Sequence, residues 1–461
     1  MHRPTVNGPR TGAQQRAPFW MIFGLGATGL SCARFLAGRG IATKIIDTRA
    51  APPHLATLRQ ELPEIIVSTV DEAASQVAAA DTLVLSPGVA LDHPLVELAR
   101  RAGVAIVGDI ELFARHATAP YVAITGSNGK STVTTLVAAI IAAAGHTVKA
   151  GANLGTPALE LLTGPTPDYF ALELSSFQLE LTENLAPEVA CVLNIAADHL
   201  DRHHTLDAYM AAKARIVRHA KCVIANADDP LVGQIIKSAG CVPVRWVSLR
   251  AAAATQYSIV EREGERWLGF GDQLILRTAE LQIKGSHNEF NALAAVAITD
   301  QLNISRTAQI AALMAFGGLE HRCRLVGERD GVSWFNDSKG TNIGAASAAI
   351  AGIFDRRGGV LIAGGQGKGA DFRELRSALI ERIHTVILIG EDAPKIAAAI
   401  DDLVTIKLAA DMRQAVASAA HAARAGEAVL LSPACASFDM FRNYEARGHA
   451  FEAAVRELFR T

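Results

Sequence analysis

Residues 121–137 read YVAITGSNGKSTVTTLV and place a strand-like run, a glycine loop and a helix-like run in direct succession. The first five residues are apolar or β-branched, which predicts a buried strand. The uncharged stretch from Ser131 to Val148 contains four threonines and one histidine, so we expect a buried helix there and not a membrane span. A strand that runs through a glycine loop into a helix is typical of a parallel α/β sheet.

The glycine loop predicts a phosphate-binding site. Successive N–H groups of such a loop point at phosphate oxygens, while Lys130 supplies a positive charge and the Ser131 hydroxyl can bind Mg²⁺. The match to the usual P-loop is incomplete, because Ile124 stands where that loop has its first glycine. An ordinary Gly/Ser turn is the alternative, and the order of strand, loop and helix favours the phosphate site.

Short β-rich runs alternate with Ala- and Leu-rich runs along most of the chain, which predicts an α/β fold. A length of 461 residues is enough for two or three domains. We expect a disordered tail at residues 1–17 and domains at 18–110, 111–318 and 319–461. The predicted strands are Trp20–Phe23, Lys44–Asp47, Thr82–Ser86 and Val104–Val107, then Tyr121–Thr125, Tyr169–Leu174, Cys191–Ile195 and Cys222–Asn226, then Val360–Ala363, Thr385–Ile389 and Ala428–Leu431. Alternating polar and apolar residues between Val242 and Leu281 predict a small antiparallel appendage on the second domain.

The composition excludes several classes of function. The 44 Lys and Arg residues against 46 Asp and Glu residues leave a net charge of -2, which argues against general binding to nucleic acid or to an anionic membrane. Aromatic residues make up only 5% of the chain, which argues against an extended base-stacking surface. The six cysteines form no CxxC pair, which favours reduced thiols over a disulfide frame or a zinc ribbon. The sequence therefore predicts a cytoplasmic protein without membrane insertion.

A second glycine turn, GLGATG, follows the first predicted strand and places Gly24, Gly26 and Gly29 in the G-x-G-x-x-G spacing. Such a turn can hold a nucleotide at a helix N-terminus, and Asp47 at the end of the next strand can bind a hydroxyl group. Taken alone, the pattern would indicate NAD. A packing turn is the alternative, because any tight strand-to-helix turn is rich in glycine.

Acidic and histidine side chains follow two predicted strands of the second domain. Glu173 lies at the carboxyl end of an apolar strand, where a carboxylate is costly to bury unless it is paired or binds a metal ion. Asp198 and His199 follow the next strand, and the carboxyl ends of parallel strands meet near the phosphate loop. We favour Mg²⁺ binding for Glu173 over a capped structural acid, and for His199 the two interpretations are balanced. Three nearby residues are interpreted as helix-start and loop residues: Asp201, His203 and His204.

Further polar clusters lie where the predicted domains should meet. Asn288 and Asn291 are three residues apart on a helix that starts near His287, so they share a face. His321 and Arg322 follow the second domain boundary. Three later segments, FNDSKGTN, GGQGKGADF and LSPACASFDMFRNYEARG, combine polar residues with glycines. One shared site accounts for these segments better than a set of separate caps and turns.

The ordered set of segments resembles the Mur ligases of peptidoglycan synthesis, from about residue 18 to the C-terminus. The resemblance rests on TGSNGKST, ELSSFQLE, DHLDRH, the lysine of AYMAAKARI, HNxxNALAA, HRC, NDSKGTN, GGxGKGADF and SPACASFDMFxNYxxRG. The last segment is similar to that of the D-glutamate-adding members. The DNPR segment of the diaminopimelate- or lysine-adding members is absent from the sequence.

The resemblance implies three domains, of which the first and third are Rossmann-like and the second is a P-loop-type ATPase domain. The implied activity is ATP-dependent addition of D-glutamate to UDP-N-acetylmuramoyl-L-alanine through an acyl phosphate. ATP and two Mg²⁺ ions are the implied cofactors, and a monomer is the expected state. The GLGATG turn would then serve a uridine nucleotide and not NAD.

The resemblance also assigns residues. Those expected to contact the UDP-sugar are Ala27, Thr28, Asp47, Thr48, Arg49, Ser86, Gly88 and Asn153. Those expected to bind ATP are Gly126, Ser127, Asn128, Gly129, Lys130, Ser131, Thr132, Asn291, Arg322 and Asp337. Those expected at the glutamate are Thr341, Lys368, Ser437 and Tyr444, with Lys339 near the phosphates.

The implied Mg²⁺ ligands are Ser131 and Glu173 for one ion and His199 for the second, which Lys213 helps to position once it is carbamylated. The expected catalytic residues are Lys130, His199, Lys213 and Lys339. From the residues alone, Lys213 is interpreted as a solvated helix residue.

Three other functions remain open. Another amino-acid-adding ligase of the same fold, such as a folylpolyglutamate synthase, is the nearest alternative, and the uridine-type first domain argues against it. A Rossmann dehydrogenase would account for GLGATG and Asp47 but leaves the phosphate loop and Glu173 without a function. A nucleotide-dependent switch protein would keep the loop but would not need a glutamate pocket.

Overall fold

The computed structural model describes residues 18–238, 240, 242–250, 256–354 and 358–460, so the tail predicted at residues 1–17 lies outside the described residues. Contacts within the chain divide it into two compact units, Met1–Phe113 and Ala114–Thr461. The described strands form three sheets, one in the first unit and two in the second. The predicted α/β fold class is therefore confirmed, while the exact domain boundaries stay predictions.

The first unit contains a parallel sheet with the strand order β3-β2-β1-β4-β5. Its strands are β1 Phe19–Phe23, β2 Ala42–Ile46, β3 Ile66–Ser68, β4 Thr82–Leu85 and β5 Ala105–Gly108. Its helices are α1 Ala27–Ala37, α2 Leu55–Glu61, α3 Val70–Val77, α4 Pro94–Arg101 and α5 Asp109–His116. Strand β3 was not predicted, because three residues at the edge of a sheet, none of them fully buried, leave no clear pattern.

The central sheet of the second unit has the order β14-β13-β12-β11-β10-β9-β6-β8-β7. Its strands are β6 Tyr121–Thr125, β7 Val148–Ala152, β8 Tyr169–Glu173, β9 Val189–Val192, β10 Cys222–Asn226, β11 Val244–Ser248, β12 Tyr257–Arg262, β13 Glu265–Phe270 and β14 Gln273–Arg277. Strand β6, which precedes the phosphate loop, lies between β8 and β9. The carboxyl ends of these three parallel strands therefore meet beside the loop, as predicted.

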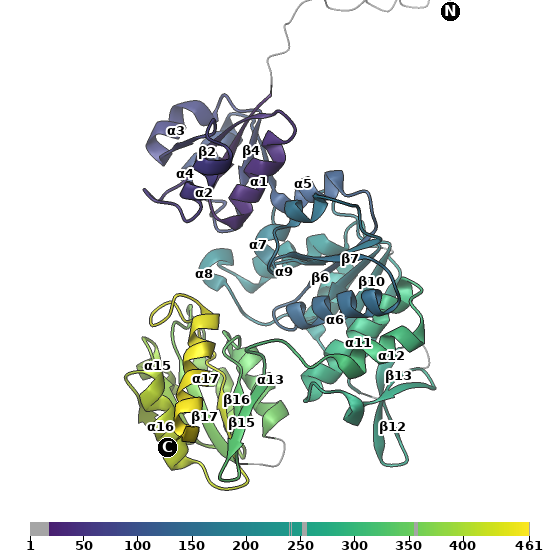
Figure 1. Ribbon diagram of the computed structural model, residues 1–461, viewed down its shortest axis with the longest axis vertical. Helices are drawn as coiled ribbons and strands as arrows, with labels where there is room; N and C mark the ends of the chain where they lie inside the picture. The colour runs from purple at the N-terminus through teal and green to yellow at the C-terminus, as the bar shows by residue number, and fades with distance from the viewer. Residues whose placement is uncertain (1–17, 239, 241, 251–255, 355–357, 461) are drawn as a thin grey trace, which may run out of the picture. The chain divides into compact units, whose positions relative to one another are not determined.

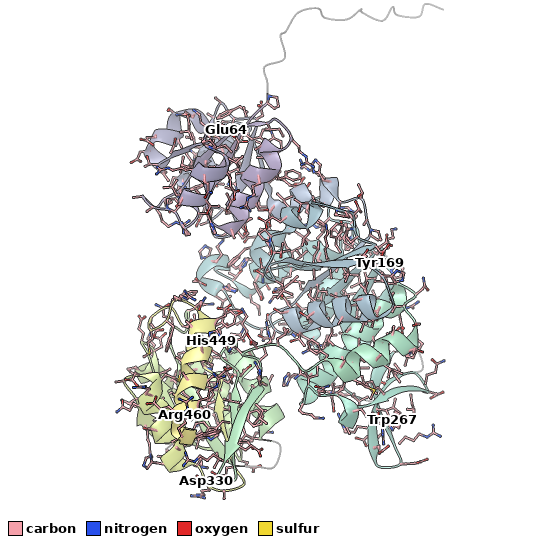
Figure 2. The ribbon with its side chains drawn as sticks, in the orientation of Figure 1. Glu64, Tyr169, Trp267, Asp330, His449 and Arg460 are labelled. Carbon is pink, nitrogen blue, oxygen red and sulfur yellow. The ribbon has the colours of Figure 1, made fainter. Side chains whose placement is uncertain are left out.

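The antiparallel appendage predicted between Val242 and Leu281 is only partly correct. Strand β11 pairs in parallel with β10, and β12 pairs in parallel with β11, so both continue the main sheet. Antiparallel pairing is confined to β12, β13 and β14, and Trp267 lies on the middle strand of this hairpin pair (Figure 2). Alternation of polar and apolar residues indicates strands with one solvent-exposed face, but it does not show whether the strands pair in parallel or antiparallel.

One face of the central sheet is covered by a layer of helices. Helix α6, Lys130–Ala143, packs against α11, Ser286–Gln301, and against α12, Arg306–Ala315 (Figure 1). The shared core contains Ile124, Val137 and Leu293. Shorter helices follow the other strand ends: α7 Ser176–Leu179, α8 Leu200–His203, α9 Leu206–Ala214 and α10 Pro230–Ser238, with 3₁₀ turns at Ala158–Leu162, Arg215–Val217 and Thr278–Glu280.

The third sheet has the order β15-β16-β20-β17-β18-β19. Its strands are β15 Arg324–Arg329, β16 Val332–Asn336, β17 Gly359–Gly364, β18 Ile383–Ile389, β19 Thr405–Leu408 and β20 Ala428–Leu431. Only β15 is antiparallel to its neighbour, and the β15–β16 hairpin turns at Asp330 and Gly331, both with positive φ (Figure 2). Strand β19 was not predicted, since it is a largely exposed edge strand.

Both faces of the third sheet are covered by helices. Alternate residues of β17 point to opposite cores: Leu361 and Ala363 face one, and Val360 and Ile362 face the other. The first core is closed by α13 Ile343–Ile353, α14 Arg376–Leu379 and α15 Ala393–Ile400, with a 3₁₀ turn at Phe372–Leu375. The second is closed by α16 Met412–Ala422 and α17 Tyr444–Arg460, which pack together (Figure 1).

Among the described residues, no helix combines the length and apolar character needed to cross a membrane.

Candidate active site

A cavity of about 420 Å³ in the second unit collects most of the residues that the sequence singled out. It is lined by residues from the phosphate loop, from the ends of β8 and β9, from α9 and from four loops of the third sheet's domain. The predicted site residues among them are Ser127, Asn128, Gly129, Lys130, Ser131, Asn153, Glu173, His199, Lys213, Arg322, Lys339, Thr341, Lys368, Ser437 and Tyr444.

A second cavity of about 350 Å³ adjoins the first, because Asn128, Gly129, Arg322 and Lys339 line both. It contains the remaining predicted nucleotide residues of this unit except Gly126, namely Thr132, Asn291 and Asp337. The predicted nucleotide residues of this unit are therefore divided between two adjoining cavities on the phosphate loop.

The phosphate loop needs glycine at its last position for two reasons. Gly129 has φ 82°, a left-handed conformation that other residues adopt at a cost. A Cβ at this position would also lie 2.6 Å from Oδ1 of Asn291, so the loop approaches α11 closely. Asn291 and Asn288 share a face of α11 as predicted, and Nδ2 of Asn291 donates to Oδ1 of Asn288 at 3.2 Å.

Lys130 is buried against the loop that it follows. Its Nζ donates to the carbonyl oxygens of Gly126 at 2.8 Å and Ser127 at 3.0 Å. Burial lowers the pKa of Lys130, while the nearby carboxylate of Glu173 acts in the opposite direction. The ammonium group is therefore held against the phosphate loop, where a bound phosphate would need a positive charge.

Glu173 ends β8 with its side chain turned into the cavity, and only 3% of the residue is exposed. Oε1 accepts a hydrogen bond from Nδ2 of Asn153 at 2.6 Å. Oε2 is buried and has no hydrogen-bond partner among the described residues. A buried carboxylate oxygen with no donor is costly, so the arrangement fits a cation ligand better than a capped structural acid.

His199 stands at the start of α8 with φ 55° and lines the same cavity. Burial lowers its pKa to about 4, although Asp198 next to it acts in the opposite direction. The ring is thus neutral at pH 7, which is the form that can bind a metal ion. Ser131, Glu173 and His199 thus line one cavity with two oxygen-bearing side chains and a neutral imidazole, and their assignment to Mg²⁺ stays a prediction.

The interpretation of Lys213 as a solvated helix residue is wrong. Only 1% of this residue is exposed, and its Nζ donates to the carbonyl oxygen of Gly126 at 2.9 Å and to Oγ1 of Thr125 at 3.2 Å. Burial and the neighbouring Lys130 hold the pKa of Lys213 well below its usual range. Alanines surround the lysine in α9, so no apolar stripe in the sequence marked this face as buried.

His203 lies in the short helix α8, which agrees with its interpretation as a helix-start residue, but its side chain is buried in a polar network. Its Nε2 lies 2.9 Å from Oγ of Ser176, and its Nδ1 lies 3.2 Å from Oε1 of Glu180. Its ring stacks on Phe177, whose edge contacts His199. This network joins α7 to α8 behind His199. Sequence reasoning missed it because Ser176 and Glu180 are more than twenty residues from His203.

Residues of the third sheet's domain meet the phosphate loop directly. Asn342 caps α13 and exchanges hydrogen bonds of 3.3 Å with the side chain of Asn128, while its Nδ2 also donates to Asp198 at 3.0 Å. Arg322 donates to Oγ of Ser131 at 2.7 Å. The predicted nucleotide residues on the two sides of the cavity are therefore already in contact.

Two ionisable residues from the NDSKGTN segment have shifted pKa values. Burial raises the pKa of Asp337 to about 6, and its carboxylate accepts hydrogen bonds from Ser432 and from the backbone of Cys323. Burial, followed by the charge of Arg322, lowers the pKa of Lys339 to about 8. The Lys339 ammonium lies 3.8 Å from the centre of the Tyr444 ring. The aromatic ring thus faces a cation beside the predicted glutamate residues.

Comparison with known proteins matches the chain to three successive family models. They are the Mur ligase MurD-like N-terminal domain at residues 19–108, the Mur ligase middle domain at 124–299 and the Mur ligase glutamate ligase domain at 321–435. A relative from Nitrosococcus oceani is 49% identical over 438 residues, which cover 95% of this chain and 96% of the relative. The chain belongs to the Mur ligase family.

The Nitrosococcus relative carries the name UDP-N-acetylmuramoylalanine--D-glutamate ligase. A Pseudomonas aeruginosa relative carries the same name and is 47% identical over 442 residues, which cover 95% of this chain and 98% of the relative. Solved Mur ligase structures share the three-domain fold. A UDP-N-acetylmuramate-alanine ligase from Thermotoga maritima superposes with a TM-score of 0.60 over 95% of this chain and 99% of its own, at 18% identity. A pseudomurein peptide ligase type C from Methanothermus fervidus superposes with a TM-score of 0.62 over 96% of this chain and 100% of its own, at 17% identity.

In this Mur ligase, the GLGATG turn of the first unit is held by Asp47. Oδ2 of Asp47 accepts from the backbone N–H of Leu25 at 2.7 Å, and both oxygens accept from the Arg49 side chain at 2.8 Å. The Arg49 guanidinium holds the pKa of Asp47 at about 2. Ser86 donates to the carbonyl oxygen of Gly24 at 2.9 Å. These residues therefore build the turn, as the packing interpretation expects, and their contact with a substrate stays a prediction.

The predicted substrate residues of the first unit differ in exposure. Ala27, Thr48, Arg49 and Gly88 are exposed, Thr28 and Ser86 are half-buried, and Asp47 is buried. Ala27 and Thr28 form the first turn of α1, which follows the GLGATG turn. Their backbone N–H groups are among those that a helix leaves without partners at its N-terminus.

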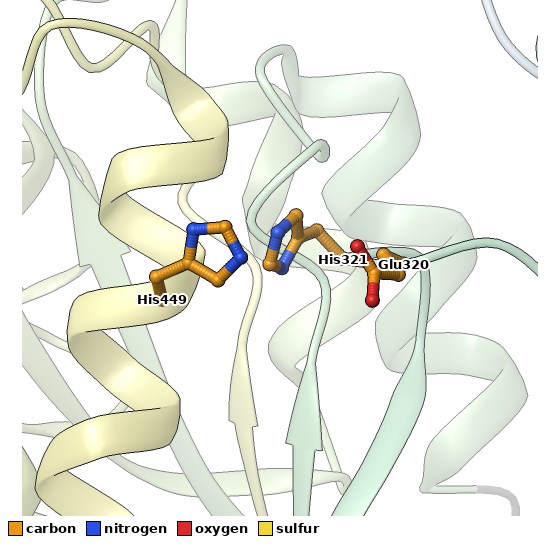
Figure 3. A group of neighbouring side chains, drawn as sticks. All are labelled: Glu320, His321 and His449. Atoms are coloured by element: carbon orange, nitrogen blue, oxygen red, sulfur yellow. The ribbon is translucent and has the colours of Figure 1, made fainter.

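Glu320, His321 and His449 of this Mur ligase offer three possible metal ligands within 4.8 Å of one another (Figure 3). The surroundings of His321 do not fit a metal ion. Nδ2 of Asn336 lies 2.9 Å from its Nδ1, and the Asn336 amide is oriented because Oδ1 accepts from the backbone of Ser338. Nδ1 is therefore the acceptor and Nε2 carries the ring proton. Nε2, which has no partner among the described residues, cannot donate a lone pair in this tautomer.

Proposed function

We propose that this Mur ligase joins D-glutamate to the L-alanine carboxylate of UDP-N-acetylmuramoyl-L-alanine and converts ATP to ADP and phosphate. The reaction belongs to the synthesis of peptidoglycan precursors in the cytoplasm, and the acting species is a monomer. The observation that carries the proposal is the cavity in which the phosphate loop faces Thr341, Lys368, Ser437 and Tyr444. The names of the relatives at 47–49% identity over nearly the full chain support the substrates.

The first step has to bring two anions together. An oxygen of the substrate carboxylate attacks the γ-phosphorus of ATP, the bond to the β,γ-bridging oxygen breaks, and an acyl phosphate and ADP result. Lys130, Lys339 and Arg322 line the cavity with positive charge and reduce the repulsion. Lys130 is the first of these, because its ammonium group is held at the loop.

Two Mg²⁺ ions would add the remaining neutralisation by polarising the phosphate oxygens. Ser131 and the unpartnered Oε2 of Glu173 would hold one ion, and neutral His199 would hold the second. Lys213 would help to place the second ion after its amine has added CO₂, since the carbamate is an anion. The depressed pKa of this buried lysine favours the neutral amine that such an addition requires.

The second step forms the amide. The neutral amine of D-glutamate attacks the acyl carbon and a tetrahedral intermediate forms. Its nitrogen then gives up a proton to solvent, and phosphate leaves with the electrons of the C–O bond. Lys368 supplies positive charge for a glutamate carboxylate, while Thr341, Ser437 and Tyr444 supply hydroxyl groups. All four residues line the cavity that also contains Lys130, so the amine and the acyl phosphate can meet there.

The proposed contacts of the UDP-sugar are the residues that the resemblance to the Mur ligases assigns to it. Ala27, Thr28, Asp47, Thr48, Arg49, Ser86 and Gly88 are the proposed contacts around the GLGATG turn, and Asn153 is the proposed contact beside Glu173. The uridine nucleotide takes the position that NAD would occupy in a dehydrogenase.

Phosphate release tests the proposal directly. The purified protein is given ATP, Mg²⁺ and UDP-N-acetylmuramoyl-L-alanine, with D-glutamate, with L-glutamate or with no amino acid. Phosphate release that needs D-glutamate is the expected result. Equal release with L-glutamate would reassign the amino acid, release with a folate in place of the UDP-sugar would favour the alternative ligase, and measurable binding of NADH would favour the dehydrogenase.

A further inference from the structure

Arg447 is a fully buried cation that forms no salt bridge with an acidic side chain among the described residues. Only 1% of the residue is exposed, and it lies in the first turn of α17, three residues after Tyr444. Burial lowers its pKa to about 10, so the guanidinium is still charged at pH 7. The charges of Asp439 and Asp337 act in the opposite direction but form no salt bridge with it, so its hydrogen bonds must account for its position.

The guanidinium instead bonds to three separate loops. Nη2 donates to the backbone oxygen of Ser338 at 2.8 Å, and Nε donates to Oγ of the same residue at 3.0 Å. Nη1 lies 3.0 Å from the carbonyl oxygen of Cys435, 3.3 Å from that of Ala436 and 3.4 Å from that of Gly364. Every nitrogen of the planar group is therefore used, and each loop contributes at least one oxygen.

The same three loops are also joined to one another. Gln366 and Ala436 form an isolated antiparallel bridge with hydrogen bonds of 3.0 Å and 2.8 Å. The backbone of Ala434 donates to Gly340 at 2.8 Å. Arg447 lies where these loops converge, so its length and planarity set the separation of the loops.

Each loop carries one of the residues assigned to glutamate. Thr341 follows Ser338, Lys368 follows Gly364, and Ser437 follows Cys435 and Ala436. We propose that Arg447 is a positioning residue that fixes the spacing of Thr341, Lys368 and Ser437, and thereby sets the affinity for the amino-acid dicarboxylate. The inference rests on the proposed function of this site.

A lysine at position 447 would keep the charge but could not replace the guanidinium. It has three donors on one nitrogen, whereas the guanidinium reaches Ser338 through Nε and Nη2 and the other two loops through Nη1, all in one plane. In Arg447→Lys, the loops would lose their common spacer while the charge of the buried site stays the same. The loss would fall on the amino-acid pocket. The phosphate loop, which receives none of the hydrogen bonds that Arg447 donates to the described residues, would stay largely unchanged.

The test compares Arg447→Lys with Arg456→Lys, a control on the same helix whose side chain is 67% exposed and pairs with Glu452. We expect Arg447→Lys to raise the KM for D-glutamate at least tenfold and to change the KM for ATP less than twofold. ADP–ATP exchange without D-glutamate, which reports the first step alone, should stay near the wild-type rate. Arg456→Lys should behave as the wild type in all three measurements.

Two further variants protect the test against a folding defect. Ser338→Ala removes the acceptor of Nε together with the hydrogen bond that Oγ donates to the backbone oxygen of Tyr444 at 2.8 Å, while the backbone acceptor of Nη2 stays. We expect a two- to fivefold rise in the KM for D-glutamate. In Arg447→Ala, added ethylguanidinium should partly restore the KM for D-glutamate, whereas a general loss of structure would not respond.

Each negative outcome has one meaning. An unchanged KM for D-glutamate in Arg447→Lys, or equal losses in both half-reactions with a lowered melting temperature, would overturn the positioning role. If the wild-type enzyme showed no saturable dependence on D-glutamate, the proposed function would fail before any variant is compared.

Discussion

Nη2 of Arg322 donates a hydrogen bond of 2.7 Å to Oγ of Ser131, although the two residues are 191 positions apart in the chain. Arg322 is flanked by two residues with positive φ, His321 at 59° and Cys323 at 47°. The segment is held by two backbone contacts, from Lys339 N–H to the His321 oxygen and from Cys323 N–H to Asp337. The guanidinium is thus presented to the phosphate loop by a fixed and strained piece of backbone.

We predict that Arg322→Lys lowers kcat/KM for ATP by about 10- to 100-fold, because a hydrogen bond from a charged group contributes about 1.5–3 kcal/mol. Initial rates over a range of ATP concentrations would measure this. Arg324→Lys is the control, since Arg324 is half-exposed and pairs only with Glu320 among the described residues. An unchanged kcat/KM in Arg322→Lys would remove Arg322 from the nucleotide site.

Lys130→Ala should abolish ligation. The ammonium group at the loop is buried, and water cannot replace a phosphate-binding cation there. Phosphate release at saturating ATP is the measurement, and Lys237→Met, on the exposed face of α10, serves as the matched control. Substantial turnover by Lys130→Ala would contradict the assignment of the loop to the γ-phosphate.

Lys213→Ala should lose most activity, and acetate should restore part of it by placing an anion at the vacated position. The reason is that a bare ammonium beside Lys130 is unfavourable by Coulomb's law, whereas a carbamate is attracted to Mg²⁺. Carbon-13 NMR of the wild-type enzyme in labelled bicarbonate should show a carbamate signal that Lys213→Ala lacks.

The pH dependence of that signal follows from the direction of the pKa shift. Because burial lowers the pKa of Lys213, the neutral amine is available at lower pH than on a surface lysine, so the carbamate should form at neutral pH. Acidification should remove the signal, since carbamates decompose in acid. Full activity of Lys213→Ala, or a wild-type enzyme without the signal, would refute carbamylation.

Asp47→Asn should destabilise the first unit at pH 7 by about 1–2 kcal/mol. The Asp47 pKa of about 2 lies below the ordinary value of 3.8. At about 1.4 kcal/mol per pH unit this shift corresponds to about 2.5 kcal/mol of stability. The expected loss is smaller because Arg49, the partner of Asp47, is half-exposed and solvent screens the pair. The sign follows from the depressed pKa. The contribution is fully present above about pH 4 and is lost as the pH falls towards 2.

Urea unfolding at pH 7 and at pH 2.5, followed by hydrogen exchange of peptides from β1 and β2, measures the effect of Asp47→Asn. The difference from the wild type should shrink at the lower pH. Glu64→Gln, an exposed position in the same unit, should show no difference at either pH. A difference that is equal at both pH values would mean that Asp47 acts through something other than its charge.

Asp47→Ala should raise the KM for the UDP-sugar and leave the KM for ATP unchanged. Asp47 supports the turn that precedes Ala27 and Thr28, so its loss would weaken ground-state binding and not the chemical step. Steady-state kinetics with each substrate varied in turn would show the split. A rise in the KM for ATP instead would place Asp47 outside the UDP-sugar site.

Local patterns in the sequence determined the class of fold and the place of the nucleotide loop. The run YVAITGSNGKST predicts strand, loop and helix because each depends on neighbours within a few residues, and the structure confirms β6 and α6. The carboxyl ends of β8 and β9 also lie beside the loop as expected, since parallel strands with short connections leave little choice. Edge strands such as β3 and β19 were not predicted, because these strands are short and their residues are at most partly buried.

The tertiary structure decided which charged side chains are buried and what they meet. Lys213 lies in an alanine-rich helix with no apolar stripe, and only the packing of α9 against the phosphate loop removes it from water. Arg447 and Ser338 are 109 positions apart, and Arg322 and Ser131 are 191 apart. Such contacts leave no periodic trace in the chain, because the free energy of burying a charge depends on partners that only the complete fold brings within hydrogen-bonding distance.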